Sequence, residues 1–310
     1  MGAELPAIRR LAIIGCGLIG GSFGMALRDA LPGLVVAGYG RSQANLHEAQ
    51  QRGAITEVAP TLADAVSNAD VILVSVPVGA LTDTLRAIAP HIKADAILMD
   101  AGSTKQDMVD AAKAVFNQPT ANGFTLSRVV PAHPIAGKEK AGVAHAEATL
   151  YRDRLVILTP TTDTTPAATA AAQALWQAVG ARVKAMDAAR HDHVFGAVSH
   201  LPHLLAFAYM NGVDPTTIAM GGTGFQDFTR IAGSDPAVWR DILHTNRDAV
   251  LTQLTQFESA LAAFKACIAN GDTDTLTHLI SQASAQRKAW HLPTGRTPSN
   301  DDDAARASYV

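Results

Sequence analysis

The chain has few cysteines, little excess charge and no long hydrophobic run, and each shortage narrows the kind of protein it can be. Its 310 residues include two cysteines, Cys16 and Cys267. They form neither a metal-binding spacing nor a disulfide framework, which suits a reducing compartment. We therefore expect a cytoplasmic protein.

Charge and hydropathy exclude further classes of partner. The formal net charge of −3 gives no reason to expect a nucleic acid or an anionic membrane as a partner. The longest apolar runs are strand-sized, well short of the roughly 20 residues that cross a bilayer, and no signal peptide precedes the first predicted strand. With 48% hydrophobic and 17% charged residues, the composition is that of a soluble enzyme, so we expect small-molecule partners. A chain of this length predicts two domains of unequal size.

A glycine-rich turn near the N-terminus is the most informative motif. The apolar run 11–14 is typical of a buried strand, and it leads through GCGLIG into residues compatible with a helix. Gly15 permits a tight turn, Gly17 lets the backbone approach a pyrophosphate, and Gly20 lets the helix pack against its strand. The candidate cofactor-binding residues of this turn are Gly15, Gly17, Leu18, Ile19 and Gly20. The pattern predicts an α/β fold with an N-terminal Rossmann-type doubly wound parallel sheet, the alternative being an incidental glycine turn.

The end of the second predicted strand, 34–39, bears on the choice of cofactor. An acid that accepts the ribose 2′-hydroxyl is expected about 20 residues after the last glycine of the motif, and that position holds Gly40. Arg41 and Ser42 follow, and they could bind a 2′-phosphate through a charge-assisted fork and a hydroxyl. We therefore favour NADP slightly over NAD, although Arg41 could also stack on the adenine of NAD.

Further strands are predicted along the first 187 residues. They lie at 71–76, 96–100, 129–131, 155–158 and 182–186, the last preceded by a helix over 165–179. The first of them is apolar throughout, as in a parallel sheet that is buried on both faces. The turn at Val76 and Pro77 is then expected to line the cofactor crevice by backbone contact. Residues 1–187 are therefore predicted to form a dinucleotide-binding Rossmann domain.

Helical patterns replace strand patterns after about Asp187. Predicted helices span 189–209, 236–269 and 276–290, with a glycine-rich loop at 221–224. The second would contain 34 residues and extend roughly 50 Å, so it would outrun its own domain. We expect a second copy of the chain to cover it, which gives a homodimer through a helical substrate-binding and dimerisation domain at 188–292. Residues 293–310 are predicted to be a disordered tail.

Candidate catalytic side chains follow the predicted strands of the first domain. His133 comes after the strand at 129–131 on a predicted loop, where α/β enzymes display catalytic groups, although it could instead be a structural residue at the strand end. Ser103 and Lys105 follow the strand at 96–100 and could equally be a helix cap and a surface charge. The ends of these strands are expected to meet at one crevice.

The helical domain carries further candidates. Its first part contains His191, His193, His200 and His203. The HExxH spacing, an acid in register and any nearby cysteine are missing, so we predict no metal site. His200 and His203 lie three positions apart on one predicted helical face, and hydrogen bonding from this pair to an anionic or hydroxylated substrate fits better, the alternative being an interdomain contact. Arg230 suits the capture of a substrate carboxylate, or else a surface ion pair with Asp227.

Together these motifs resemble the prephenate dehydrogenase family, which also contains arogenate and cyclohexadienyl dehydrogenases. The resemblance runs from residue 11 to about residue 290. It rests on the glycine motif, on DAGSTK around Ser103, on HPIAGKEKAG from His133, on HDHVFGAVSHLPH at 191–203 and on GGTGFQDFTRIAGSDPAVWRDI from Gly221. The last three are specific together, whereas the glycine motif alone is not.

The resemblance implies a role for each site residue. His133 would accept the proton of the ring 4-hydroxyl while C4 delivers a hydride to the nicotinamide. Ser103 would hydrogen-bond the same hydroxyl and orient His133, and Arg230 would hold a substrate carboxylate. The residues implied around the pocket and its gate are His203, Glu139, Asp227 and Trp239. Gly40 departs from the acid of NAD-specific members, which leaves the cofactor choice open.

The implied reaction is the oxidative decarboxylation of prephenate to 4-hydroxyphenylpyruvate, or of arogenate to tyrosine, in tyrosine biosynthesis. It needs a base with a pKa of about 6.5, a cation for the carboxylate and a hydride acceptor, and His133, Arg230 and the glycine turn are candidates for the three. Two alternatives stay open. One is another Rossmann and helical-domain dehydrogenase that acts on a 3-hydroxy acid or an imino acid, and the other is a protein that senses NAD(P)H without turnover.

Overall fold

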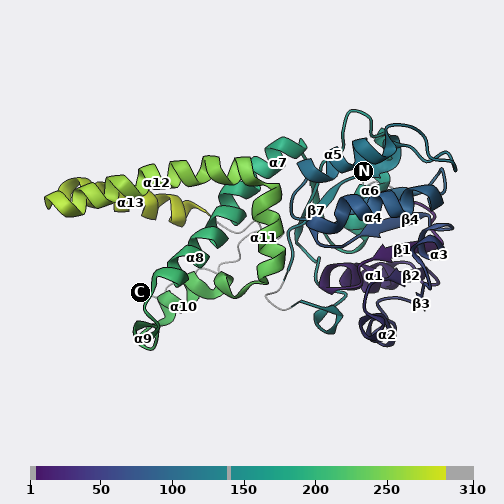
Figure 1. Cartoon of the computed structure of the whole chain (residues 1–310), viewed down its shortest axis with the longest axis horizontal. Helices are drawn as coiled ribbons and strands as arrows, with labels where there is room; N and C mark the ends of the chain where they lie inside the picture. Colours follow the sequence, from purple (N-terminus) through teal and green to yellow (C-terminus); the bar gives the residue numbers. More distant parts are fainter. Residues whose placement is uncertain (1–4, 138–140, 291–310) are drawn as a thin grey trace. The chain divides into compact units, whose positions relative to one another are not determined.

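The computed structural model describes residues 5–137 and 141–290. These described residues fall into two compact units, which divide between residues 250 and 251 (Figure 1). Glu139, which is expected near the pocket, and the tail at 293–310 lie outside the described residues.

A six-stranded parallel sheet forms the centre of the first unit. Its strands are β1 (Arg10–Ile14), β2 (Val35–Tyr39), β3 (Glu57–Val58), β4 (Val71–Val74), β5 (Ile97–Asp100) and β6 (Val129–Val130). Their order across the sheet is β3-β2-β1-β4-β5-β6, and β1 pairs in parallel with both β2 and β4. The chain extends from β1 to one edge and then from β4 to the other, which confirms the predicted doubly wound Rossmann-type sheet.

Helices cover both faces of this sheet. The core on one face includes residues of α1 (Leu18–Ala30), α2 (Gln43–Gln51) and α6 (Pro166–Ala178), and the core on the other includes residues of α3 (Leu62–Val66), α4 (Leu81–Ile88) and α5 (Gln106–Phe116). Ile13 and Leu73 point into the first core, whereas Ile14 and Ile72 point into the second. Because neighbouring strand residues alternate between two buried faces, the strands are apolar throughout.

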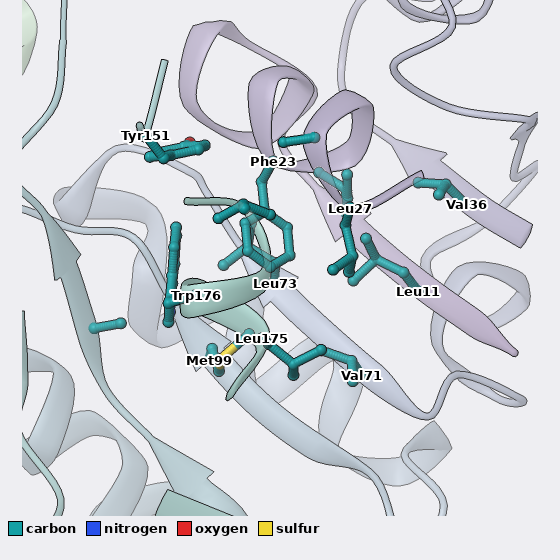
Figure 2. Packing of buried hydrophobic residues seen from close by; sticks show 14 of the residues in the cluster. Leu11, Phe23, Leu27, Val36, Val71, Leu73, Met99, Tyr151, Leu175 and Trp176 are labelled. Carbon is teal, nitrogen blue, oxygen red and sulfur yellow. The ribbon is translucent and has the colours of Figure 1, made fainter. Parts of the chain in front are cut away.

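Figure 2 shows the first of these cores, where aromatic rings from distant parts of the chain meet. The ring centroid of Trp176 lies 4.6 Å from that of Phe23 and 5.3 Å from that of Tyr151. Burial of a side chain of this size contributes roughly 1.5–3 kcal/mol. The hydroxyl of Tyr151 donates to the carbonyl of Ile19 at 2.6 Å. The core therefore also holds the first turn of α1, directly after the glycine-rich turn.

A second, three-stranded sheet follows the first. It contains β7 (Ala132–Pro134), β8 (Leu155–Leu158) and β9 (Arg182–Ala185). Strand β8 pairs antiparallel with β7 and parallel with β9. Pro131, which has no N–H to donate, separates β6 from β7, and the N–H of Ala132 donates to the carboxylate of Asp100 at 2.9 Å. His133 thus lies within a short strand, and the expectation that it sits on a loop is wrong.

Helical elements follow β9 in the described part of the first unit. They are α7 (Ala188–Phe195), a π-helical turn (Gly196–His200), α8 (Leu201–Gly212), α9 (Pro215–Ile218), α10 (Thr223–Thr229), a 3₁₀ turn (Arg230–Gly233) and α11 (Pro236–Thr245). The predicted helix over 189–209 is confirmed apart from the π-helical turn. Strands end close to residue 187, as predicted, but α7 to α11 belong to the same compact unit as the sheets. The assignment of 188–292 as a functional domain stays a prediction.

The predicted single helix over 236–269 is wrong, because the helix is broken at Asn246. Helix α11 ends at Thr245, and α12 (Arg247–Asn270) begins beyond the break. The buried side-chain amide of Asn246 donates to the carbonyl of Asp192 at 2.8 Å and to Nδ1 of His200 at 2.9 Å. These contacts fix a change of backbone conformation at one residue, which apolar periodicity does not reveal.

The described part of the second unit contains the rest of α12 and α13 (Thr273–Ala289). Gly271 lies between them with a φ of 68°, a conformation that favours glycine. Asp272 then caps α13 by accepting from the N–H of Thr275 at 3.0 Å. The predicted final helix is confirmed, although it begins at Thr273. No helix in 5–137 or 141–290 is long and apolar enough to cross a membrane.

Candidate active site

A cavity of about 650 Å³ opens at the carboxyl ends of β1, β2 and β4, which is where this topology predicts a cofactor. Its lining residues are Ile14, Gly15, Cys16, Gly17, Tyr39, Gly40, Arg41, Ser42, Asn45, Leu62, Ser75, Val76, Pro77, Ala80 and Thr84. The structure thus brings together the predicted cofactor residues Gly15, Gly17, Arg41, Ser42, Val76 and Pro77. The other three, Leu18, Ile19 and Gly20, form the first turn of α1.

The backbone of the glycine-rich turn leaves room for a phosphate. Gly15 has a φ of 99°, and a Cβ on it would lie 2.3 Å from the carbonyl oxygen of Ser75. A Cβ on Gly20 would lie 2.4 Å from the carbonyl oxygen of Gly15, so α1 packs directly on the turn. A Cβ on Gly17 would meet no atom within 4 Å. Because Gly17 is the N-cap of α1, the residues present fit a dinucleotide pyrophosphate at this helix N-terminus.

The edge of the cavity after β2 holds the residues that are expected to bind the 2′-hydroxyl or 2′-phosphate of the adenosine ribose. A Cβ on Gly40 would come no closer than 3.7 Å to the side chain of Leu46, which is an ordinary van der Waals contact. The hydroxyl of Ser42 accepts from the N–H of Asn45 at 3.2 Å and caps α2. Arg41 is exposed on the same rim. Both a cation and a helix N-terminus therefore border the cavity at this point.

His133 is the first member of a chain of hydrogen bonds that ends at α5. Its Nδ1 lies 2.8 Å from Nε2 of His191, and Nδ1 of His191 lies 2.7 Å from the carboxylate of Asp192. That carboxylate also accepts from the backbone N–H groups of Lys105 and Gln106, at 2.8 and 2.9 Å. His191 is fully buried, whereas His133 is only half-buried. A small molecule can therefore reach His133 but not its partner.

The protonation states of this chain follow from its surroundings. Burial lowers the pKa of His133 well below its usual value of 6.5. The charge of Lys105 lowers it further, as does protonation of His191 or His200. Burial alone would raise the pKa of Asp192, but hydrogen bonds from His191 and from two backbone N–H groups outweigh it and lower that pKa. At pH 7 His133 is therefore neutral and Asp192 is ionised. The sequence-based expectation that the pKa of His133 lies at about 6.5 is too high.

Lys105 and Asp100 tie the strand of His133 to the parallel sheet. Lys105 is fully buried, forms an ion pair with Asp100 and donates to the carbonyl of Ala132 at 2.9 Å. Asp100 accepts from the N–H of Ala132 at 2.9 Å and from the N–H of Gly102 at 2.8 Å. The alternative that Lys105 is a surface charge is therefore wrong. Lys105 is a buried cation that contacts the residue immediately before His133.

Ser103 lies on the loop between β5 and α5 and is half-buried. In the described part of the chain its hydroxyl makes no hydrogen bond to His133, whose partner is His191. The ring of His133 is also packed against Phe195, with centroids 4.8 Å apart. Contact between Ser103 and a substrate hydroxyl stays a prediction.

Helices α8 and α11 bring together further residues implied in substrate binding. The ring of His203 stacks on Trp239, with centroids 3.6 Å apart and planes inclined by 19°. Nδ1 of His203 donates to the carbonyl of Ser199 at 2.9 Å. Burial lowers the pKa of His203, and the positive charge of Arg230 lowers it further, against the opposing effect of that hydrogen bond. The 3₁₀ turn that begins at Arg230 packs against α8, which carries His203. Both Arg230 and Asp227 are exposed.

The other histidines of this region have separate surroundings. His193 is exposed on α7, whereas His200 is buried and accepts a hydrogen bond at Nδ1 from Asn246. Within residues 5–137 and 141–290, no group of three or more His, Cys, Asp or Glu side chains is arranged to hold a metal ion. His191, His200 and His203 take part in polar and aromatic contacts instead.

Sequence reasoning missed Asp192 and Asn246 and considered His191 only as a metal ligand. The adjacent His191 and Asp192 hint at a paired role, but the pair follows the predicted strand region and gives no sign of its partner. His133 lies 58 positions earlier in the chain. Such a contact depends on how α7 packs against β7, so no local spacing could have identified it.

Two family models match the chain. The model for the prephenate dehydrogenase nucleotide-binding domain matches residues 23–185, and the model for the prephenate dehydrogenase dimerization domain matches residues 187–282. The two matches meet just after β9, where strands give way to helices. Together they account for most of both the described sheets and the described helices.

Similar proteins of known name cover nearly the whole chain. The cyclohexadienyl dehydrogenase of Zymomonas mobilis is 34% identical over 292 residues, which cover 92% of this chain and 97% of that protein. The prephenate dehydrogenase of Bacillus subtilis is 30% identical over 289 residues, which cover 91% of this chain and 76% of that protein.

Solved structures agree with these sequence matches. The prephenate dehydrogenase from A. aeolicus in complex with hydroxyphenyl propionate and NAD+ is similar with a TM-score of 0.83 at 32% identity, over 92% of this chain and 99% of that one. The arogenate dehydrogenase of Synechocystis is similar with a TM-score of 0.75 at 25% identity, over 90% of this chain and 99% of that one. The chain therefore belongs to the prephenate dehydrogenase family of nicotinamide-dependent oxidoreductases.

Proposed function

We propose that this enzyme oxidises prephenate at ring carbon C4 and releases the C1 carboxylate as CO₂, which yields 4-hydroxyphenylpyruvate for tyrosine biosynthesis. The observation that carries the proposal is the state of His133. It is half-buried, neutral at pH 7 and hydrogen-bonded through Nδ1 to His191. His133 also follows β6, which pairs with β5. Strand β5 pairs in turn with β4, and the residues after β4 line the cofactor cavity. A base in this position suits the removal of a hydroxyl proton during hydride transfer.

The residues of the chain divide the chemistry between them. A nicotinamide bound in the cavity after β1 supplies the acceptor for the hydride that leaves C4. Nε2 of His133 takes the proton of the 4-hydroxyl, so C4 becomes a ketone carbon. The bond between C1 and its carboxylate then breaks, and its electron pair enters the ring and makes it aromatic. The phenolate oxygen takes the proton back from His133, and the release of CO₂ makes the step irreversible.

Substrate binding is assigned to the residues that precede and follow α10. Arg230 carries the cation for a substrate carboxylate, because a guanidinium binds a carboxylate through two parallel hydrogen bonds. The stacked rings of His203 and Trp239 offer a flat apolar surface, and His203 lies on α8, which packs against the turn that begins at Arg230. Ser103 is assigned a hydrogen bond to the 4-hydroxyl, and Asp227 and Glu139 a place around the pocket and its gate.

Arogenate is a second candidate substrate, since it differs from prephenate only in carrying an amino group in place of the side-chain keto group. Two similar proteins, named cyclohexadienyl dehydrogenase and arogenate dehydrogenase, support it. The ring chemistry assigned to His133 is the same for both substrates, so the choice depends on contacts to the side chain.

For the cofactor we propose a modest preference for NADP over NAD. Gly40 supplies no carboxylate to accept the ribose 2′-hydroxyl or to repel a 2′-phosphate. Arg41 and Ser42 line the same edge of the cavity and could bind that phosphate. The similar structure from A. aeolicus contains NAD+, so the expected preference is one of degree.

We also propose a homodimer formed through the helical segment 188–292, in the cytoplasm. The match to a dimerization-domain model over residues 187–282 supports the dimer. Exposed apolar side chains on α12 support it as well, because Leu261 and Ile268 are 54% and 69% exposed. The reducing cytoplasm suits Cys16, a free thiol in the cofactor turn.

The test is a matrix of initial rates, with prephenate or arogenate as the substrate and NAD+ or NADP+ as the cofactor. We expect formation of reduced nicotinamide with release of one CO₂ per hydride, and the aromatic product identifies the substrate. Nicotinamide reduction without CO₂ would point instead to a hydroxy-acid or imino-acid dehydrogenase. Cofactor binding with no turnover of any substrate would point to a sensor of the cofactor.

A further inference from the structure

The hydrogen bonds behind His133 run in one direction only. Asp192 is ionised and accepts from two backbone N–H groups at the start of α5, so its carboxylate has no proton to donate. Nδ1 of His191, 2.7 Å away, must therefore carry a proton and donate it. The pKa of His191 is lowered by burial, so at pH 7 its ring is neutral and its Nε2 holds a lone pair.

The state of His191 determines the state of His133. Nε2 of His191 lies 2.8 Å from Nδ1 of His133 and can only accept. His133 must then carry its single proton on Nδ1, which leaves a lone pair on Nε2. In the described part of the chain Nε2 makes no hydrogen bond, and the residue is half-buried. The basic nitrogen is thus the one that a bound molecule can reach.

Packing keeps both rings in this arrangement. The ring of Phe195 lies 4.8 Å from that of His133 and 4.4 Å from that of His191, measured between centroids. Asp192 is anchored to α5, as described, and its own carbonyl accepts from the side chain of Asn246 at 2.8 Å. The acceptor for His133 is therefore held by contacts that do not involve the substrate.

We propose that His191, held by Asp192, is the positioning residue that fixes His133 as the Nδ1–H tautomer and so directs its basic Nε2 toward the substrate. This inference rests on the proposed function for its kinetic consequence, but the tautomer itself is a property of the free enzyme. His191 touches neither substrate nor cofactor in this assignment, because it is fully buried.

The kinetic test compares three variants of α7. His191→Phe keeps a ring against Phe195 but removes the acceptor, and kcat should fall on the order of 10²-fold, because His133 then loses its orientation. His191→Gln keeps an amide oxygen that can accept from Nδ1, and it should recover most of that loss. His193→Phe, a change at the exposed histidine of the same helix, should match the wild type. The affinity for the cofactor should be the same in all three.

A spectroscopic test works without substrate. Nitrogen-15 spectra of histidine-labelled enzyme at neutral pH should show His133 with a protonated Nδ1 and an unprotonated Nε2, with the signal assigned by its loss in His133→Asn. In His191→Phe the proton should shift toward Nε2, and in His191→Gln it should stay on Nδ1.

Two results would overturn the inference. One is a wild-type His133 that carries its proton on Nε2, and the other is a His191→Phe enzyme with wild-type kcat. Failure of the proposed function looks different, since the wild-type enzyme would then release no CO₂ from prephenate or arogenate. The spectra would in that case still determine whether His191 sets the tautomer.

Discussion

Lys105 and Asp100 form an ion pair that is withdrawn from solvent, with side-chain exposures of 0% and 1%. Both partners also bind the backbone of Ala132, one at its carbonyl and the other at its N–H. Ala132 directly precedes His133, so the pair holds the candidate base in place relative to the end of β5. Removing one partner of such a buried ion pair strongly lowers the stability of the fold, because the other charge is then left buried without compensation.

Replacing Lys105 by methionine should therefore destabilise the fold. The change leaves the Asp100 carboxylate buried without its cation, and the free energy of unfolding should fall by about 3–5 kcal/mol. Urea unfolding measures this loss. Lys113→Met is a matched control, since Lys113 is exposed on α5 and its replacement should change stability by no more than about 0.5 kcal/mol. Equal stabilities of the two variants would contradict the structural role of Lys105.

The pH dependence of kcat/KM should reflect the environment of His133. A base must be unprotonated to act, so activity falls as the pH drops through its pKa. Burial lowers that pKa well below 6.5, and the charge of Lys105 lowers it further. The rate should therefore still be on its plateau at pH 6.5 and decline only below it. His133→Asn should lower kcat/KM by about 10²-fold or more and abolish this acid limb, whereas a half-maximal rate at pH 6.5 in the wild type would contradict the assignment.

Local chemistry made the first part of the fold predictable. The apolar residues of β1, the positive φ needed at Gly15 and the close packing at Gly20 all act within a few positions of one another. The two-residue strand β3 was not predicted, because Glu57 and Val58 are too short a stretch to show a pattern. The break at Asn246 was also missed, because its cause is a contact with Asp192, which lies 54 positions away.

In the candidate site, too, single residues could be predicted from the sequence, whereas the contacts between them could not. The position of His133 after an apolar strand suggested a catalytic group, and the structure gives it a suitable protonation state. Its partner His191 and the buried state of Lys105 depend on how α7, β7 and the β5 end pack together. Sequence patterns describe faces of single elements, so they do not show which side chains from different elements meet.

Buried His200 should make the stability of the protein depend on pH. Burial lowers its pKa from 6.5 to about 4, so between these values the unfolded chain binds a proton that the folded chain does not. Stability from this residue is complete above pH 6.5 and is lost as the pH falls toward 4. Between pH 7 and pH 5 the loss is about 2 kcal/mol. His200→Gln should reduce the measured change in unfolding free energy by about that amount, and an unchanged pH dependence would rule out this contribution.

Cofactor choice should respond to an acid at position 40. A Cβ on Gly40 would make only an ordinary van der Waals contact, at 3.7 Å from the side chain of Leu46. Gly40→Asp would place an anion beside Arg41 and Ser42, which repels a 2′-phosphate and accepts from a 2′-hydroxyl. The ratio of kcat/KM values should shift toward NAD by about 1–3 kcal/mol. The rate with saturating NAD should stay near that of the wild type, and an unchanged ratio would show that this edge of the cavity does not read the ribose.

Arg230 separates a substrate-binding role of the helices from a purely structural one. If its guanidinium holds a carboxylate of prephenate in a site with little water, Arg230→Gln should cost about 2–4 kcal/mol in kcat/KM, mainly through KM. Arg230→Lys should recover only part of this loss, because an ammonium cannot form the planar pair of hydrogen bonds. The affinity for the cofactor should not change, since the glycine-rich turn lies on a different part of the unit.

The alternative role for Arg230 is a surface ion pair with Asp227, and it predicts a different result. An exposed pair contributes only about 0.2–1 kcal/mol to stability and nothing to KM. Arg247→Gln is the control for such a loss, because Arg247 is 69% exposed and lies 3.3 Å from the carboxylate of Asp248. Steady-state kinetics and melting temperatures of both variants distinguish the roles. A raised KM for prephenate in Arg230→Gln alone supports the carboxylate anchor, whereas a lower melting temperature with an unchanged KM would reject it.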